Sequence, residues 1–403
     1  MKKSLLALAV LGSFAAAAQA QTSVTIYGIV DMGVFYQNKA GAHNNGLFSV
    51  NSGELSGSRL GFKGSEDLGG GLKANFVLEM GFNANNGSGA QQDAGSTTFF
   101  GRTSTVGLSG GFGSVNIGRQ TDFAYSGTAG GMNTFSHAGY VTNFSTVDGN
   151  KQARLQGDRT NNSIRYDMPS MNGLNGGVMY GLGQQAGGGS AGSVYAAGLK
   201  YDNGPLAFGG DYYQSKVGLT PADRNLINNV TASADGLTST STSMGQTATK
   251  TFTLGASYDF GFGKLYGNWS RVNMLPLTPS ATATTSQTFN TGSYGSGSAN
   301  NKLDIFEIGY NHNLTASLKL LTGLAHTNVS FNNGTPQGRL NQAFIGTDYF
   351  LSKRTDLYAV ATYVRTSDVA NPLAISGTVG TGNPGNLNAG SAYGMGVGIR
   401  HTF

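Results

Sequence analysis

The amino-acid sequence predicts an all-β protein, a 16-stranded antiparallel transmembrane β-barrel. Three observations lead to this fold class. Apolar residues fall on every second position through most of the chain, about sixteen segments carry this alternation, and the last segment ends on a bare aromatic residue, Phe403. A period of two residues indicates β-strands whose two faces meet different surroundings.

The start of the chain has the organisation of a secretory signal peptide. Lys2 and Lys3 form a basic start, residues 5–18 are apolar, and Ala18-Gln19-Ala20 fits a cleavage site. The alternative is a short buried helix, which would not need these features in this order. We therefore expect residues 1–20 to be removed on export and residues 21–403 to form one outer-membrane β-barrel domain.

The composition excludes several classes of protein. The absence of cysteine excludes a disulfide scaffold and thiol chemistry. Charged residues make up 11% of the chain and aromatic residues 10%, the reverse of the balance in disordered chains. Without Lys2 and Lys3 the formal net charge falls from +5 to +3, which is too small to indicate a nucleic-acid partner.

The direction of the apolar face decides between two all-β architectures. In the first strand-like segment, residues 24–36, Val24 and Ile26 share one face and Tyr27 and Asp31 share the other. A soluble β-sandwich would bury the apolar face, whereas a transmembrane barrel turns it toward lipid. Alternation alone does not separate the two, but the signal peptide and the terminal aromatic favour the barrel. Between the first segment and the last, the others centre on residues 59–64, 72–82, 98–108, 114–120, 162–168, 176–182, 194–201, 206–214, 252–260, 264–272, 305–311, 318–328, 342–351 and 357–365.

The connections between these segments alternate in length. Residues 65–71 and 351–355 are short, whereas residues 216–250 and 369–391 are long and rich in Gly, Ser, Thr and Asn. Outer-membrane barrels show this asymmetry between periplasmic turns and extracellular loops. The long connection 121–158 differs because it holds six large aromatic or apolar residues, so we expect it to fold into the barrel and pack against the inner wall.

Several blocks of sequence are distinctive, among them "SVTIYGIVDMG", "GSRLGFKGSEDLGGGLKANFVLEMGF", "GRTSTVGLSGGFGSVNIGRQ" and the terminal "RHTF". Through these blocks the mature chain resembles the trimeric general diffusion porins of Gram-negative bacteria, in particular their beta-proteobacterial branch. The resemblance implies a homotrimer in the cell outer membrane, with a water-filled channel for small hydrophilic solutes and ions. It also implies that residues 121–158 form a constriction loop. As further partners it implies outer-membrane lipid and lipopolysaccharide, and the barrel assembly machinery, for which Phe403 would be the assembly signal.

Charged side chains on the lumen face are the candidate site. Arg59 and Lys63 share one parity, opposite the apolar parity of their segment, and the resemblance implies a column of arginines at Arg59, Arg102 and Arg159. The alternative is that such arginines only pair with carboxylates to stabilise the wall. The predicted pore-lining and constriction residues are Arg59, Lys63, Arg102, Arg159, Arg165, Asp122, Asp148, Glu79 and Asp31.

A second set of residues is expected on the outer face. Parity places Arg119 there, so we leave it out of the pore. The same reasoning assigns small and apolar residues to a subunit interface on the outer face: Thr103, Thr105, Gly107, Val115 and Ile117.

The charge of the constriction loop leads to the functional prediction. Between Phe123 and Val147 the loop has no acidic residue, and Lys151 and Arg154 add positive charge. We therefore expect a passive porin that is weakly to moderately anion-selective, with no catalytic residues, cofactor or metal site. Two alternatives remain: a substrate-specific channel lined by the aromatic residues of the loop, and a non-conducting barrel that acts as a receptor or adhesin.

Overall fold

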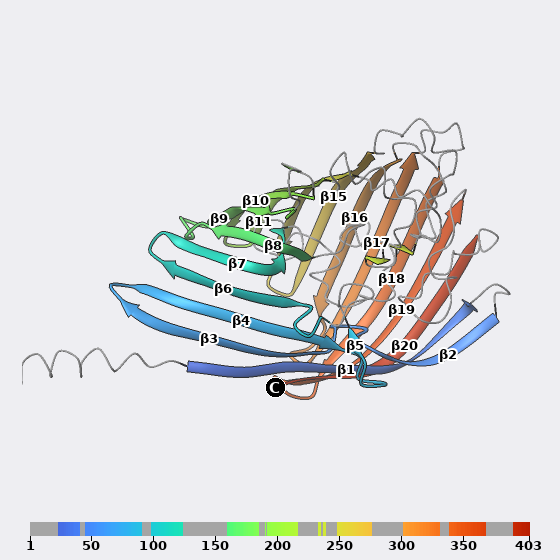
Figure 1. The fold of residues 1–403 in the computed structure, drawn as a ribbon. Coiled ribbons are helices and arrows are strands. Elements are labelled where there is room, and N and C mark those ends of the chain that lie inside the picture. Colours follow the sequence, from blue (N-terminus) through green and yellow to red (C-terminus); the bar gives the residue numbers. More distant parts are fainter. Residues whose placement is uncertain are drawn as a thin grey trace, which may run out of the picture.

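The computed structural model describes residues 23–40, 45–90, 98–123, 159–184, 190, 192–216, 233–234, 237–238, 248–275, 301–330, 338–367 and 390–403. Within these ranges, one 18-stranded antiparallel sheet closes on itself, because β1 (Ser23–Ala40) pairs with β20 (Ser391–Thr402). Figure 1 shows the strands as one curved wall. No helix in the described ranges is long and apolar enough to span a membrane.

Four of these strands are pieces of two interrupted wall strands. β2 (Asn45–Ser52) and β3 (Arg59–Gly69) pair with successive halves of β1, so together they make one wall strand broken at residues 53–58. In the same way, β5 (Gly89–Ala90) and β6 (Thr103–Gly110) both pair with β4 (Leu72–Phe82). The described wall therefore has sixteen strands, and the predicted barrel is confirmed.

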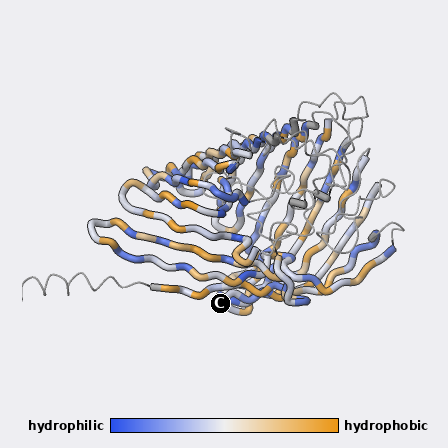
Figure 2. The backbone as a smooth tube through the Cα atoms, in the orientation of Figure 1, coloured by the Kyte–Doolittle hydropathy of each residue, from blue (hydrophilic) through white to orange (hydrophobic). Residues whose placement is uncertain are grey.

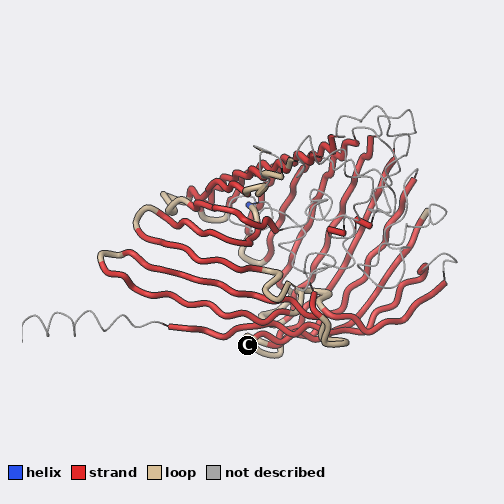
Figure 3. The backbone as a smooth tube through the Cα atoms, in the orientation of Figure 1, coloured by secondary structure: helices blue, strands red, loops and turns tan. Residues whose placement is uncertain are grey.

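Each remaining wall strand pairs with its neighbours in the sequence, and short turns join most of them at one end of the barrel (Figure 3). The turn between β3 and β4 lies at the same end as the N-terminus, since Ser23 pairs with Ser65. By the usual asymmetry this end is periplasmic. The remaining strands are β7 (Gly113–Thr121), β8 (Arg159–Asp167), β9 (Leu174–Gly181), β10 (Val194–Asn203), β11 (Leu206–Ser215), β14 (Ala248–Asp259), β15 (Gly263–Leu275), β16 (Asn301–Asn313), β17 (Leu318–Ser330), β18 (Gly338–Phe350) and β19 (Thr355–Ser367), with β12 (Ser233–Ala234) and β13 (Leu237–Thr238) in a separate two-stranded sheet.

The outer face of the wall is apolar. Ile26 is 62% exposed, whereas Asp31, on the opposite parity of the same strand, is fully buried. In Figure 2 hydrophobic and hydrophilic residues alternate along the strands. Exposed apolar side chains continue around the barrel to Leu324 on β17 and Val397 on β20. This orientation suits a barrel surrounded by lipid and excludes the soluble sandwich.

Part of the inner face is also apolar. Val272, Leu303, Leu340 and Val364, near the extracellular ends of β15, β16, β18 and β19, are fully buried members of one hydrophobic cluster. The inner wall is therefore less polar than simple alternation suggests. Phe123, at the start of the predicted constriction loop, is fully buried in a second cluster with Met179 and Tyr213, and residues 124–158 lie outside the described ranges.

Candidate pore-lining site

Asp31 holds residues 53–58, the segment between β2 and β3, against the inner wall. One carboxylate oxygen, Oδ2, accepts hydrogen bonds from the backbone N–H groups of Leu55, at 2.9 Å, and Ser56, at 2.7 Å. The other, Oδ1, accepts one from the Tyr358 hydroxyl at 2.7 Å. All of these groups lie on the lumen side, so residues 53–58 turn inward. Asp31, predicted to line the pore, is buried beneath this segment.

Arg400 lies beside two further carboxylates of the inner wall, those of Asp348 and Asp356. Its guanidinium makes a two-pronged contact with Asp356, with a shortest distance of 2.6 Å, and its Nη2 lies 3.6 Å from Asp348. Nη1 donates to the Ser56 hydroxyl at 3.0 Å. Asp348 and Asp356 are both buried. The acids of β18 and β19 therefore face a cation inside the wall and present little negative charge to water.

On the other side of β1 along the wall, Arg102 and Glu79 form a buried ion pair. Arg102 Nε lies 2.6 Å from Glu79 Oε1, and the Tyr27 hydroxyl also hydrogen-bonds this carboxylate. Glu79 pairs across the sheet with Gly61 and Thr103, which places it on the lumen face as predicted. Glu79 therefore balances the charge of Arg102. This is the alternative role considered for the arginines, in which they pair with carboxylates and stabilise the wall.

Lys63 and Arg59 hold different positions on β3. The Lys63 side chain is exposed, and its ammonium lies 5.3 Å from the centroid of the Tyr27 ring. Arg59 is half-buried, and its Nε donates to the carbonyl of Gly57 at 2.9 Å, at the end of the inward segment. Among the predicted cations in the described ranges, Lys63 has the fewest neutralising contacts.

Arg165 anchors the start of the connection that follows β7. Its guanidinium makes a two-pronged contact with Asp167, with distances of 2.6 to 3.0 Å, and donates to the carbonyl of Thr121 at 2.9 Å. It also stacks on the ring of Phe123, with 4.2 Å to the centroid. Asp122, between these two residues, is buried. Asp148, the other predicted acid of this connection, lies outside the described residues.

Arg159, predicted to line the pore, does not share the lumen parity of Ser163 and Arg165. Asn162 has a left-handed backbone, with φ 53°, and interrupts the alternation of β8. As a result Thr160 and Ser163 are both buried, and Arg159 falls on the other parity. Its Nε donates to the carbonyl of Arg102 at 2.8 Å, across the intervening strand β7.

The outer-face assignment fails for the residues of β6. Thr103 pairs with Glu79, so Thr103, Thr105 and Gly107 share the lumen face. Arg102 lies before the first residue of β6, so its own inward direction does not set the alternation of the strand. The outward residues are Val106 and Leu108 in β6, together with Val115, Ile117 and Arg119 in β7 as predicted.

These features together define a membrane channel protein: a closed barrel with an apolar outer surface and a charged inner wall. The family model described as Gram-negative porin matches residues 7–332, and the chain belongs to this family of outer-membrane porins. An outer membrane porin protein of Bordetella pertussis is 30% identical, and outer membrane porin protein 32 of Delftia acidovorans is 32% identical, each over 100% of both chains.

Solved structures show the same architecture. The anion-selective porin from Comamonas acidovorans superposes with a TM-score of 0.66 and 28% identity, covering 95% of this chain and 100% of the other. OmpT of Vibrio cholerae, described in a trimer form, has a TM-score of 0.61 at 14% identity, covering 95% and 99%. The second likeness supports the fold alone.

Proposed function

We propose that this outer-membrane channel is a homotrimer that passes small hydrophilic solutes passively, with a weak to moderate preference for anions. The selectivity is inferred from a difference in exposure between the acidic and the basic side chains of the lumen. Asp31, Glu79 and Asp356 are buried and bound by donors, whereas Lys63 is exposed. An exposed charge acts on passing ions over about 8 Å at physiological salt. A cation with few counter-charges therefore raises the local concentration of anions.

The comparisons support the same proposal. The Comamonas porin is called anion-selective, and its likeness to this chain covers almost the whole barrel. The proposal keeps residues 1–20 as a signal peptide and residues 121–158 as the constriction, and it includes no catalytic step.

Planar-bilayer recording of the purified protein tests the proposal. Under a potassium chloride gradient at low salt, the reversal potential should have the sign of anion selectivity and should fall toward zero as both solutions approach molar salt. A clearly cation-selective channel would contradict the charge argument. Failure to conduct at all would favour the receptor or adhesin alternative.

A further inference from the structure

The wall strand formed by β2 and β3 contains more residues than its neighbour requires. Met32 of β1 pairs with Ser52, and Ile29 pairs with Arg59. Two residues of β1 therefore face six residues, 53–58, an excess of four. An ordinary β-bulge adds only one residue to a strand. This excess does not fit in the plane of the sheet, so the segment must leave it, either toward lipid or toward the lumen. We call residues 53–58 the inward segment.

The side chain of Asp31 places the inward segment inside the barrel. Asp31 is fully buried on the lumen parity of β1, whereas Ile26 and Val34, on either side of it along the strand, are 62% and 51% exposed on the outer face. The segment that binds the Asp31 carboxylate therefore lies in the lumen, at the level of the lipid-facing wall. Irregular backbone at this depth is tolerated only where it is buried in protein or lines a water-filled cavity.

Asp31 binds the inward segment at both ends and in the middle. Its backbone carbonyl accepts a hydrogen bond from the N–H of Gly53 at 2.9 Å, and its Oδ2 accepts those of Leu55 and Ser56. At the far end, the backbone N–H of Asp31 donates to the Ser58 hydroxyl at 3.0 Å. One residue of β1 therefore fixes the position of the whole segment against the wall.

A second strand reaches the same carboxylate. Tyr358 of β19 donates to Asp31 Oδ1 at 2.7 Å, and its side chain crosses β20 to do so. Gly398 of β20 pairs with Tyr358 on one side and with Gly33 of β1 on the other. A Cβ at Gly398 would overlap the ring and hydroxyl of Tyr358, so the bare backbone provides the path of this side chain. The carboxylate that holds the inward segment is thus itself held from β19.

The inward segment has a buried base and an accessible tip. Glu54, Leu55 and Ser58 are each 1% exposed. Ser56 and Gly57, at the tip, are partly exposed. A turn of backbone whose base is fixed and whose tip reaches water narrows a channel by a constant amount. Because neither tip residue carries a charge, the narrowing acts on the size of a solute rather than on the sign of an ion.

We propose that the inward segment is a second, fixed constriction of the pore, which limits the size of passing solutes in addition to residues 121–158. This inference rests on the proposed function, since it requires a conducting channel. Ser56 and Gly57 border the path of the solute. Asp31 and Tyr358 are positioning residues, because they act on the solute only by holding the segment in place.

Cysteine modification tests the constriction, because the chain has no cysteine of its own. Gly57→Cys places a thiol at the tip, and a neutral methanethiosulfonate reagent adds volume there without charge. Resistances along a pore add in series, so an adduct at the narrowest level causes the largest loss of single-channel current. The lumen control is Asn75→Cys, on the same face of β4 as Glu79 but nearer the periplasmic end. The lipid-facing control is Ile26→Cys.

The adduct at Gly57→Cys should reduce the single-channel current by a larger fraction than the adduct at Asn75→Cys, and the adduct at Ile26→Cys should leave it unchanged. If the loss at Gly57→Cys is no larger than at Asn75→Cys in a channel that conducts with the anion-selective sign, the inward segment is not a constriction, and the proposed function stands. A wild-type protein that does not conduct would overturn both.

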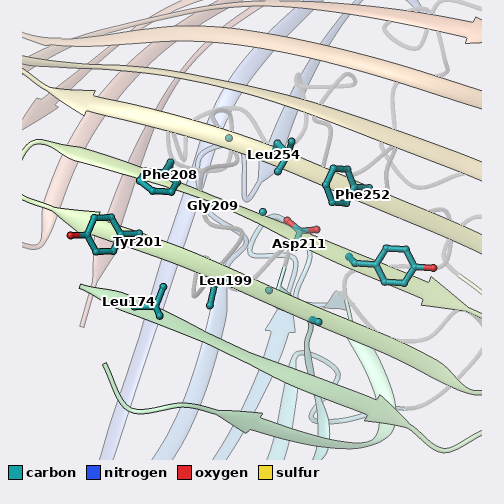
Figure 4. Close-up of a pocket in the computed structure, with 13 residues that line it drawn as sticks. Leu174, Leu199, Tyr201, Phe208, Gly209, Asp211, Phe252 and Leu254 are labelled. Carbon is teal, nitrogen blue, oxygen red and sulfur yellow. The ribbon is translucent and has the colours of Figure 1, made fainter. Parts of the chain in front are cut away.

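Asp31→Asn and Tyr358→Phe test whether the wall holds the segment. An amide nitrogen cannot accept a hydrogen bond, and phenylalanine keeps the ring without the hydroxyl. Each change should make the open-channel current fluctuate between levels, since a segment with fewer hydrogen bonds moves. The matched control is Asp211→Asn, a lumen acid that is 3% exposed on β11 (Figure 4), a strand that pairs with β10 and β14 without a break.

A steady current in both Asp31→Asn and Tyr358→Phe, or equal fluctuation in Asp211→Asn, would show that Asp31 does not fix the inward segment. A gel-mobility shift on heating verifies that each variant is folded. Tyr358→Phe, which leaves the bonds between Asp31 and the segment in place, decides the question if Asp31→Asn does not fold.

Discussion

Gly28 and Phe403 join the first wall strand to the last residue of the chain. The backbone N–H of Gly28 donates to the Phe403 carbonyl at 3.0 Å, and the N–H of Phe403 donates back to the Gly28 carbonyl at 3.1 Å. The Phe403 ring lies on the bare α-carbon, where a Cβ on Gly28 would come within 2.3 Å of the ring. The terminal aromatic therefore closes the seam of the barrel as well as ending the chain.

Loss of this contact should impair barrel formation. Phe403→Ser is expected to lower the yield of folded protein in the outer membrane, because it removes the ring from the seam and from the predicted assembly signal. Tyr393→Ser is the matched control, at the other end of β20, with 40% exposure against 42% for Phe403. Quantitative blots of unheated and heated membranes measure the folded fraction. Equal yields of the two variants would show that the position of the aromatic is irrelevant.

The proposed trimer can be tested by cysteine cross-linking, since the chain has no cysteine of its own. Ile117 and Ile308 are both 52% exposed on the outer face, on β7 and β16. Ile117→Cys should cross-link between subunits with a bifunctional maleimide, and Ile308→Cys should not. The unheated wild type should also sediment as an oligomer and run as a monomer after boiling. Sedimentation of the wild type as a monomer would exclude the assembly.

Lys63 should contribute to ion selectivity. Lys63→Gln is expected to move the reversal potential toward zero, because it removes an exposed lumen cation while the buried carboxylates keep their partners. Lys353→Gln, an exposed cation in the turn before β19, provides the control and should change the potential little. Recordings under a potassium chloride gradient compare the two. If the reversal potential of Lys63→Gln equals that of the wild type, Lys63 does not contribute to selectivity.

Arg102→Ser should act mainly on stability. It leaves the buried Glu79 carboxylate without its closest cation, and breaking a buried pair in this way costs about 3–5 kcal/mol. The double variant Arg102→Ser with Glu79→Gln should recover much of that loss, since no charge is then left without its counter-ion. The temperature at which the heat-induced gel shift occurs measures both. If the double variant is no more stable than the single, the pair does not account for the effect.

Sequence alone was sufficient for the wall and for the face of most residues. The number of strands, the outward direction of Val24 and Ile26, and the lumen position of Asp31 and Glu79 all follow from alternation, because a barrel keeps one environment on each side. Arg400 also lies on the polar parity of the last segment. Its partners Asp348 and Asp356 depend on strand register, which a single sequence does not reveal.

The errors have local causes. Arg159 was misassigned because one left-handed residue, Asn162, shifts the alternation, and asparagine tolerates that conformation without marking it in the sequence. The residues of β6 were misassigned because the expected segment, 98–108, begins five residues before the strand, which starts at Thr103. β2 was missed because its sequence, "NGLFSVNS", has the composition of a loop.

The strand order has a consequence for how the chain folds. Each wall strand pairs with its neighbours in sequence, so every hairpin joins residues that are close along the chain, and only the seam between β1 and β20 joins distant parts of it. The entropy cost of closing a chain grows only with the logarithm of its length, about 0.6 kcal/mol for each doubling. Lengthening a surface connection therefore adds little to the cost of this final step. The barrel can therefore accept large loop insertions at little added free-energy cost.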